Sequence, residues 1–242
     1  MEAVLSDLPF PPPPGEDDLP STDGVPVQSD DHLLQQRILW ESLRRLYAGR
    51  SDVYVACELG LYYSELQAAR REFLSPDIFV AFESNQRSRK SWLMWKEEVG
   101  PVFVLELLSE STEAVDRGEK MRIYSQILRV PEYFLYDPLD YRLEGYRLDL
   151  ATRRYAPIPA DASGSVPSGT LGAQFGVLDG DYFDRQHPWL RVYGSDGALI
   201  PLDLEVAAQE SARAAQESAR AEAATNELER LKEKLRALGV DP

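Results

Sequence analysis

Cysteine and histidine are scarce in this 242-residue sequence, and it contains no long apolar run. Cys57 is the only cysteine, which excludes an internal disulfide. His32 and His187 lie too far apart for the usual spacing of zinc ligands. There is neither a stretch of about 18 apolar residues nor a basic, apolar leader. We therefore expect a soluble, cytoplasmic protein with no membrane contact and no structural zinc.

Positive charge is also scarce: 26 Lys and Arg face 41 Asp and Glu, for a net charge of −15. Residues 1–36 hold eight of the acidic residues and no Lys or Arg, and 203–242 hold nine acidic and six basic residues. The central segment 37–202 therefore keeps 24 acidic and 20 basic residues, a net charge of −4. The total argues against a protein that coats nucleic acid, whereas the central segment is nearly balanced.

Three segments follow from composition. Residues 1–28 are acidic and rich in proline, which predicts a disordered leader. Residues 29–202 have the apolar density of a folded domain, and 203–242 form an Ala/Glu/Arg-rich helix in which AAQESAR occurs twice in succession. Four leucines follow at heptad spacing, Leu228, Leu231, Leu235 and Leu238. This helix is either a coiled coil that forms a homodimer or a solvated helix that docks on a partner.

Apolar periodicity predicts an α/β core in the central segment. Helices are expected over 30–48 and 112–129, and a flexible loop over 160–169. The expected strands are rich in β-branched and aromatic residues: 52–56, 59–63, 77–82, 101–108, 132–137, 141–149, 153–158 and the stretch around 175–178. A hairpin is expected in 189–202, where Ser-Asp-Gly separates two apolar runs.

Two acidic residues stand out in this pattern. Asp77 begins one strand, and Glu106 lies inside the otherwise apolar run VFVLELL. A buried, unpaired carboxylate would cost several kcal/mol, so Glu106 needs a cation, a hydrogen-bond network or a metal ion. Carboxylates on neighbouring strands suit Mg²⁺, which is commonly held by one or two carboxylates plus water. The alternative is that Glu106 belongs to a buried salt bridge.

The next helix offers a cation near these carboxylates. Asp116, Lys120 and Tyr124 recur every four residues and therefore share one face. A lysine beside a metal-bound water and a phosphate can orient the water or stabilise developing negative charge. The alternative for Lys120 is a surface lysine that pairs only with Asp116.

The blocks PDIFVAF and FVLELLSESTEAVDRGEKMRIYSQILRVPEYFLYDP resemble the Uma-two type of restriction endonuclease, a branch of the PD-(D/E)XK nuclease superfamily. The resemblance implies a restriction-endonuclease-like core, a mixed central sheet flanked by helices, with a β-rich extension and a long C-terminal helix. It also implies that Asp77 and Glu106 are the metal-binding carboxylates. Leu108 occupies the usual lysine position, so Lys120 would supply the ammonium instead.

The expected activity is hydrolysis of phosphodiester bonds in DNA with Mg²⁺ or Mn²⁺, by Asp77, Glu106 and Lys120. The supporting residues on this hypothesis are Asp116, Tyr124, Glu58 and Glu41. Basic side chains that would meet the DNA backbone are Arg87, Arg89, Lys90, Arg117 and Arg122. The rival hypothesis is a catalytically inactive, nuclease-like scaffold that assembles complexes through its C-terminal helix.

Overall fold

The computed structural model describes residues 13–20, 29–70 and 72–237. The predicted leader 1–28 therefore lies mostly outside the described residues, as does Leu238. The chain divides into two units, Met1–Ile200 and Pro201–Pro242. None of the described helices combines the length and the apolar character needed to cross a membrane.

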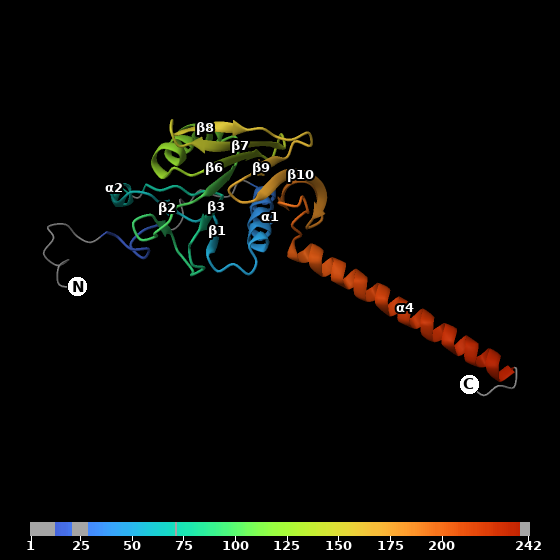
Figure 1. The fold of residues 1–242 in the computed structure, drawn as a ribbon. Helices are drawn as coiled ribbons and strands as arrows, with labels where there is room; N and C mark the ends of the chain where they lie inside the picture. The colour runs from blue at the N-terminus through green and yellow to red at the C-terminus, as the bar shows by residue number, and fades with distance from the viewer. Residues whose placement is uncertain (1–12, 21–28, 71, 238–242) are drawn as a thin grey trace, which may run out of the picture. The chain divides into compact units, whose positions relative to one another are not determined.

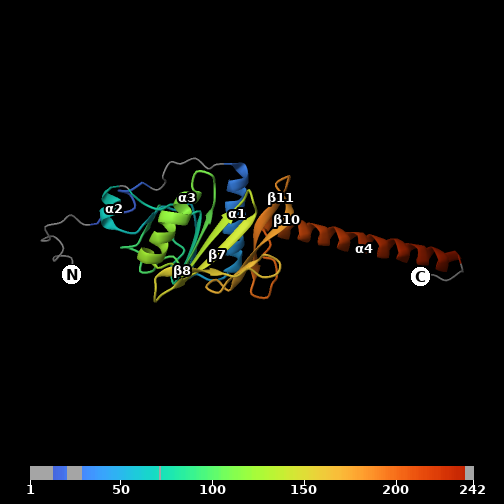
Figure 2. The same cartoon turned by 90° about the horizontal axis from the view of Figure 1, so that it is seen from above.

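A mixed six-stranded sheet forms the centre of the first unit (Figures 1 and 2). Its strand order is β1-β3-β5-β6-β7-β8, and only β5 and β6 run parallel. The six strands are β1 (Val53–Cys57), β3 (Ile78–Phe82), β5 (Phe103–Leu107), β6 (Glu132–Asp137), β7 (Arg142–Asp149) and β8 (Arg154–Ile158). Parallel neighbours need a crossover connection, and the helical segment 113–128 provides it. The predicted α/β fold with a mixed central sheet is confirmed.

Helices cover both faces of the sheet. The helix α1 (Asp30–Leu46) packs Leu39 and Leu43 against Val80, Phe103 and other residues of one face. On the opposite face, Ile123 and Tyr124 of the crossover pack against Phe79, Val104 and other residues because alternate side chains of a strand point to opposite faces. The sheet is therefore buried on both sides, which explains the nearly continuous apolar strands in the sequence.

The crossover helix is wider than an ordinary α-helix. It begins as α3 (Glu113–Val115) and continues as two π-helical segments, η1 (Asp116–Lys120) and η2 (Ile123–Leu128). It ends at Arg129, whose left-handed backbone (φ 54°) closes the helix. Such π turns are rare and occur frequently at functional sites.

A smaller sheet and a two-stranded pair complete the first unit. The three-stranded sheet consists of β9 (Val166–Ser168), β10 (Ala173–Tyr182) and β11 (Arg185–Gly194). Short strands β2 (Leu61–Tyr62) and β4 (Trp92–Leu93) pair in parallel, and α2 (Glu65–Ala69) follows β2. In the second unit, α4 (Asp203–Ala237) is a single long helix.

Three local expectations differ from the structure. The loop expected over 160–169 contains β9, which pairs with β10. The long hairpin is formed by β10 and β11. The expected Ser-Asp-Gly turn only reverses the chain after β11, where Tyr193 and Leu199 form an isolated bridge. The strand expected over 59–63 is reduced to Leu61–Tyr62, because its partner β4 offers only two residues for pairing.

Candidate functional site

Asp77 and Glu106 lie side by side at one end of the central sheet. The antiparallel register pairs Ile78 with Leu105, which places the next residues, Asp77 and Glu106, opposite each other. The Asp77 N–H donates to Glu106 Oε2 at 3.3 Å, and the Leu107 N–H donates to Asp77 Oδ2 at 2.6 Å. The backbones of the two strands thus hold both carboxylates in one place.

Glu106 is almost completely buried, with 1% of its surface exposed. Its Oε1 accepts a hydrogen bond from the Tyr124 hydroxyl at 2.9 Å and lies 3.1 Å from Lys120 Nζ. Lys120 Nζ also lies 2.8 Å from Asp116 Oδ1. Lys120 therefore bridges the strand carboxylate and a carboxylate of its own helix. The structure brings together the five residues that the sequence singled out: Asp77, Glu106, Asp116, Lys120 and Tyr124.

Negative charge exceeds positive charge at this position. Three carboxylates, those of Asp77, Glu106 and Asp116, lie around the ammonium of Lys120. Burial raises the pKa of Glu106 to about 8; Lys120 opposes this shift, and the nearby Asp116 and Asp77 add to it. Burial acts to lower the pKa of Lys120, but Glu106 and Asp116 outweigh it, and the pKa lies above its ordinary value. Lys120 is therefore charged at neutral pH. Glu106, by contrast, is protonated more readily than an ordinary glutamate, because burial and the surrounding negative charge oppose its ionisation.

The N-terminal part of α1 contributes two side chains that sequence reasoning missed. Gln36 Nε2 donates to Asp77 Oδ1 at 2.6 Å and to Glu58 Oε1 at 3.1 Å. His32 lies one turn earlier, with Nε2 3.2 Å from the same Asp77 oxygen. The polar residues four positions apart at the start of an apolar-faced helix were the available signal. Gln36 also connects Glu58, an expected supporting residue, to the pair of carboxylates.

Glu41, the other expected supporting residue, lies further along α1. It follows Gln36 by five residues, which corresponds to about 140° around the helix and roughly 7.5 Å along it. Glu41 therefore faces a different direction from Gln36, and the helix geometry does not favour a role beside Asp77.

The expected DNA-contacting residues are held in different ways. Arg89 is buried: its guanidinium stacks over Tyr54 and Trp92 and binds both oxygens of Glu97, at 2.8 and 3.0 Å. Its position favours a structural role. Arg87 and Lys90 are more exposed and pair with acidic side chains.

The two arginines on the crossover helix also differ. Arg117 binds Glu144 through both terminal nitrogens, at 3.0 and 2.8 Å, and Glu113 through Nε at 2.8 Å. These hydrogen bonds leave little of its guanidinium for another anion. Arg122 is exposed on the same helix, so it is the better placed of the two to contact a phosphate.

The donor atoms around Asp77 and Glu106 suit a hard cation. They are carboxylate oxygens, which Mg²⁺ and Mn²⁺ prefer, and a divalent ion would compensate the excess negative charge. Among the described residues, no group of three or more His, Cys, Asp and Glu side chains is arranged as a metal cage. The fit is therefore to an ion with two protein carboxylates and otherwise water or substrate oxygens, as is usual for Mg²⁺.

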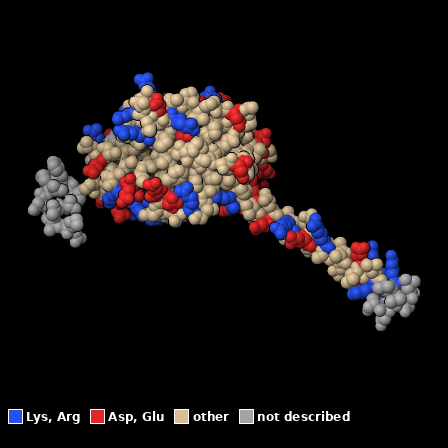
Figure 3. Space-filling view, in the orientation of Figure 1, with Lys and Arg blue, Asp and Glu red and all other residues tan. Residues whose placement is uncertain are grey.

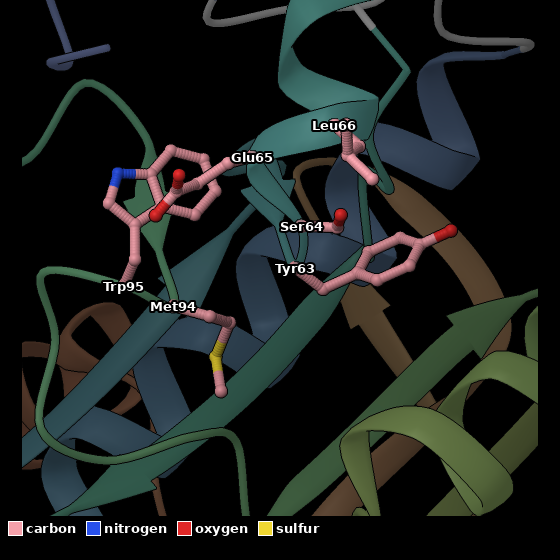
Figure 4. A pocket seen from close by; sticks show the side chains of 6 residues that line it. All are labelled: Tyr63, Ser64, Glu65, Leu66, Met94 and Trp95. Carbon is pink, nitrogen blue, oxygen red and sulfur yellow. The ribbon is translucent and has the colours of Figure 1, made fainter. Parts of the chain in front are cut away.

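A shallow hollow lies elsewhere on the first unit (Figure 4). In this view Trp95, Glu65 and Met94 lie on one side of it, and Tyr63, Ser64 and Leu66 lie on the other. None of these six residues belongs to the group around Lys120. The hollow adjoins the attachment of residues 13–20, because the Trp95 indole N–H donates to the carbonyl of Pro14 at 3.3 Å.

A mixed sheet covered by helices on both faces, with the carboxylates of Asp77, just before β3, and Glu106, in β5, together at one end, is a restriction-endonuclease-like α/β fold. The chain belongs to the Uma2 family: the family model, described as "Putative restriction endonuclease", matches residues 22–180, more than half of the chain. The resemblance seen in the sequence is thereby confirmed.

Two individual proteins are similar to the chain. The crystal structure of "a putative nuclease belonging to DUF820" from Anabaena variabilis matches with a TM-score of 0.46 and 16% sequence identity, over 66% of this chain and 91% of the other. The "Uncharacterized protein slr1290" of Synechocystis is 29% identical over 91 residues. That alignment spans 37% of this chain and 45% of the relative, so the chain matches less than half of the relative's length.

Proposed function

We propose that this protein is a Mg²⁺- or Mn²⁺-dependent endonuclease that hydrolyses phosphodiester bonds in DNA. The observation that carries the proposal is the position of Lys120, whose ammonium lies 3.1 Å from the buried Glu106 carboxylate, beside Asp77. Two carboxylates and a lysine at one point suit phosphoryl chemistry, in which catalysis is mainly positioning and charge stabilisation. The family membership supports the same class of reaction.

Each side chain has a defined task in this proposal. Asp77 and Glu106 would hold the divalent ion, which when bound polarises the phosphate and acidifies a water. Lys120 directs its ammonium toward the water and the negative charge that develops as the new P–O bond forms and the old one breaks. Asp116 and Tyr124 position Lys120 and Glu106 through the 2.8 and 2.9 Å contacts. Gln36 and His32 orient Asp77.

The test is cleavage of plasmid and oligonucleotide DNA with Mg²⁺, with Mn²⁺ and with a chelator. Wild type should cleave only with metal, and Asp77→Asn should lose cleavage while keeping its fold by circular dichroism. Cleavage that survives the chelator or Asp77→Asn would contradict the proposal. Parallel RNA substrates determine whether DNA is the preferred nucleic acid.

The alternative is an inactive scaffold that acts through α4, and one observation favours it. Leu228 and Leu231, at the a and d positions of the heptad pattern, are 52% and 51% exposed. Exposed apolar residues at heptad positions favour association with another helix, and a second copy of the chain would make a homodimer. Sedimentation equilibrium of wild type and Leu228→Glu/Leu231→Glu tests this, and a wild-type monomer would exclude the dimer. A dimer without cleavage of any nucleic acid would favour the scaffold.

A further inference from the structure

Residues 13–20 form an acidic strap that is attached to the first unit at both ends. Near one end, Trp95 Nε1 donates to the Pro14 carbonyl at 3.3 Å. At the other end, the Tyr62 hydroxyl donates to the Pro20 carbonyl at 2.7 Å, and Leu19 packs into the small apolar cluster around Tyr62. The strap is thus bound as a peptide ligand would be, by backbone carbonyls and one apolar side chain.

Between these attachments, the strap binds the two exposed cations of the loop after β3. Glu16 Oε1 lies 2.9 Å from Arg87 Nη1, and Glu16 Oε2 accepts the Lys90 N–H at 3.0 Å. Asp17 Oδ1 lies 2.5 Å from Lys90 Nζ. Burial acts to raise the pKa of Glu16, but hydrogen bonds from Lys90 and Arg87 outweigh it and lower the pKa. The hydrogen bond from Lys90 lowers the pKa of Asp17. Both carboxylates are therefore charged at neutral pH.

The strap partly neutralises two cations that could otherwise bind a phosphate. Arg87 has a second ion pair outside the strap, with Nη2 2.7 Å from Glu97 Oε1. Arg89 is buried with Glu97, whereas the side chains of Arg87 and Lys90 are 44% and 67% exposed even with the strap in place. Along the lower edge of the face in Figure 3, acidic and basic side chains stand next to each other instead of forming a basic surface. Carboxylate oxygens at these positions present the same chemistry as phosphodiester oxygens.

A duplex bound at the proposed site is long enough to reach this loop. Arg87 and Lys90 follow the end of β3 that lies opposite Asp77, and five strand residues span roughly 17 Å. That length equals about five base-pair steps at 3.4 Å each. DNA with its reacting phosphate near Glu106 would therefore be long enough to reach these cations by passing around the sheet, because β3 itself is covered on both faces.

We propose that residues 13–20 are an autoinhibitory strap that competes with the nucleic-acid backbone for Arg87 and Lys90. This inference rests on the proposed function. The free energies of the two competing contacts are close to balanced, because exposed ion pairs contribute little to stability. The strap has the advantage of being tethered, and its prolines restrict the chain before it binds. DNA has the advantage of releasing counterions when its phosphates are neutralised.

The test compares the full-length wild type with Glu16→Gln/Asp17→Asn, which keeps the shape of both side chains and removes their charges. Affinity for a labelled duplex is measured by fluorescence anisotropy with a chelator present, so that cleavage does not interfere. Glu217→Gln/Glu222→Gln on α4 is the matched control, because it removes the same two charges from exposed positions outside the strap. Neutralising the strap should tighten binding by about two- to tenfold, and the control should not.

Two further measurements decide the mechanism. Neutralising the strap should steepen the dependence of affinity on salt, since two more phosphates are contacted. Adding Arg87→Ala/Lys90→Ala to the neutralised strap should abolish the gain. Three outcomes would overturn the autoinhibitory role of residues 13–20: a gain in DNA affinity no larger than in the control, a gain that survives Arg87→Ala/Lys90→Ala, or no DNA binding by any variant. Cleavage with Mg²⁺ is measured separately. If neutralising the strap tightens binding but no variant cleaves DNA, the proposed endonuclease activity is contradicted. If the protein cleaves DNA but the strap has no effect on binding, only the proposed autoinhibition is contradicted.

Discussion

The ammonium of Lys120 lies 3.1 Å from Glu106 Oε1, although the two residues are fourteen positions apart and on different elements. Directly after the strand of Glu106, the position that a (D/E)XK motif would give to lysine is occupied by the buried Leu108. On the proposed function, Lys120 of the crossover helix takes the part of that lysine: its ammonium contacts Glu106 and Asp116, and Tyr124 of the same helix donates to Glu106.

Lys120→Met should abolish most of the cleavage. A positioned proton-transfer or charge-stabilising group contributes about 10²–10⁴-fold, so we expect a loss of that order in the single-turnover rate with saturating Mg²⁺. Lys96→Met, on an exposed residue of another loop, is the control and should retain the rate. A Lys120→Met enzyme with near wild-type rate would remove Lys120 from the mechanism and leave it as a partner in a buried salt bridge.

Glu106 should make the stability of the metal-free protein decrease with pH. Its pKa is about 8 in the folded protein, against the ordinary value of 4.5. Because the folded-state pKa is raised, the contribution to stability is fully present below about pH 4.5 and is lost as the pH rises through about 8. Urea unfolding with a chelator between about pH 5 and pH 9 should show this slope in wild type, at most about 1.4 kcal/mol per pH unit.

Glu106→Gln provides the control for this pH dependence. The variant has no titrating carboxyl at this position, so its stability should vary less over the same range. Excess Mg²⁺ should bind wild type more tightly as the pH rises, because the ion requires the ionised carboxylate. Identical slopes for wild type and Glu106→Gln would show that Glu106 is not the titrating group.

Gln36→Leu should weaken metal binding without unfolding the protein. Gln36 donates to Asp77 Oδ1 at 2.6 Å, and residues that orient a ligand typically contribute 10- to 100-fold to metal affinity. We expect an increase of that size in the Mg²⁺ concentration for half-maximal cleavage, checked by calorimetry. Gln35→Leu is a matched control, because its amide binds the backbone of Leu190 instead. It should lower stability and leave the Mg²⁺ dependence unchanged.

The sequence was sufficient for the parts of the site that lie within one local segment. Glu106 is conspicuous because a carboxylate interrupts an apolar strand, and the four-residue spacing of Lys120 identified the helix face that meets it. Gln36 and His32 could not be placed in the same way. They come from a helix more than 40 residues before Asp77, and periodicity alone does not fix how a helix is positioned over a sheet.

The sequence did not predict the β10–β11 hairpin or the burial of Arg89, because neither follows from local residue preferences. The β10–β11 hairpin turns at Phe183 and Asp184, both with positive φ, where the favoured signal would be Asn-Gly. Arg89 has the sequence context of an exposed loop, and only the folded chain brings Glu97, Tyr54 and Trp92 around it. Both features depend on contacts that override local preference, so neither was visible in the composition of its segment.

Glu132→Ala should destabilise the protein without changing its chemistry. Glu132 is fully buried at the start of β6 and accepts hydrogen bonds from Arg147 at 3.0 Å, from the Ser168 hydroxyl and from the Gly169 N–H at 3.2 Å. It therefore connects the central sheet to the segment around β9. Alanine would leave the buried Ser168 hydroxyl and backbone N–H groups without this acceptor, at a cost of about 3 kcal/mol in the free energy of unfolding.

The measurement for Glu132 is urea unfolding of wild type, Glu132→Ala and Glu132→Gln at one pH. Glu132→Gln keeps one acceptor oxygen and loses the charge, so its stability should fall between the other two. Glu119→Ala, on an exposed residue, should change stability by less than about 0.5 kcal/mol. The rate and Mg²⁺ dependence of Glu132→Ala should match wild type where it remains folded, because its partners are separate from the group around Lys120. A changed Mg²⁺ dependence in Glu132→Ala would instead mean that the β9 segment helps to position the carboxylates.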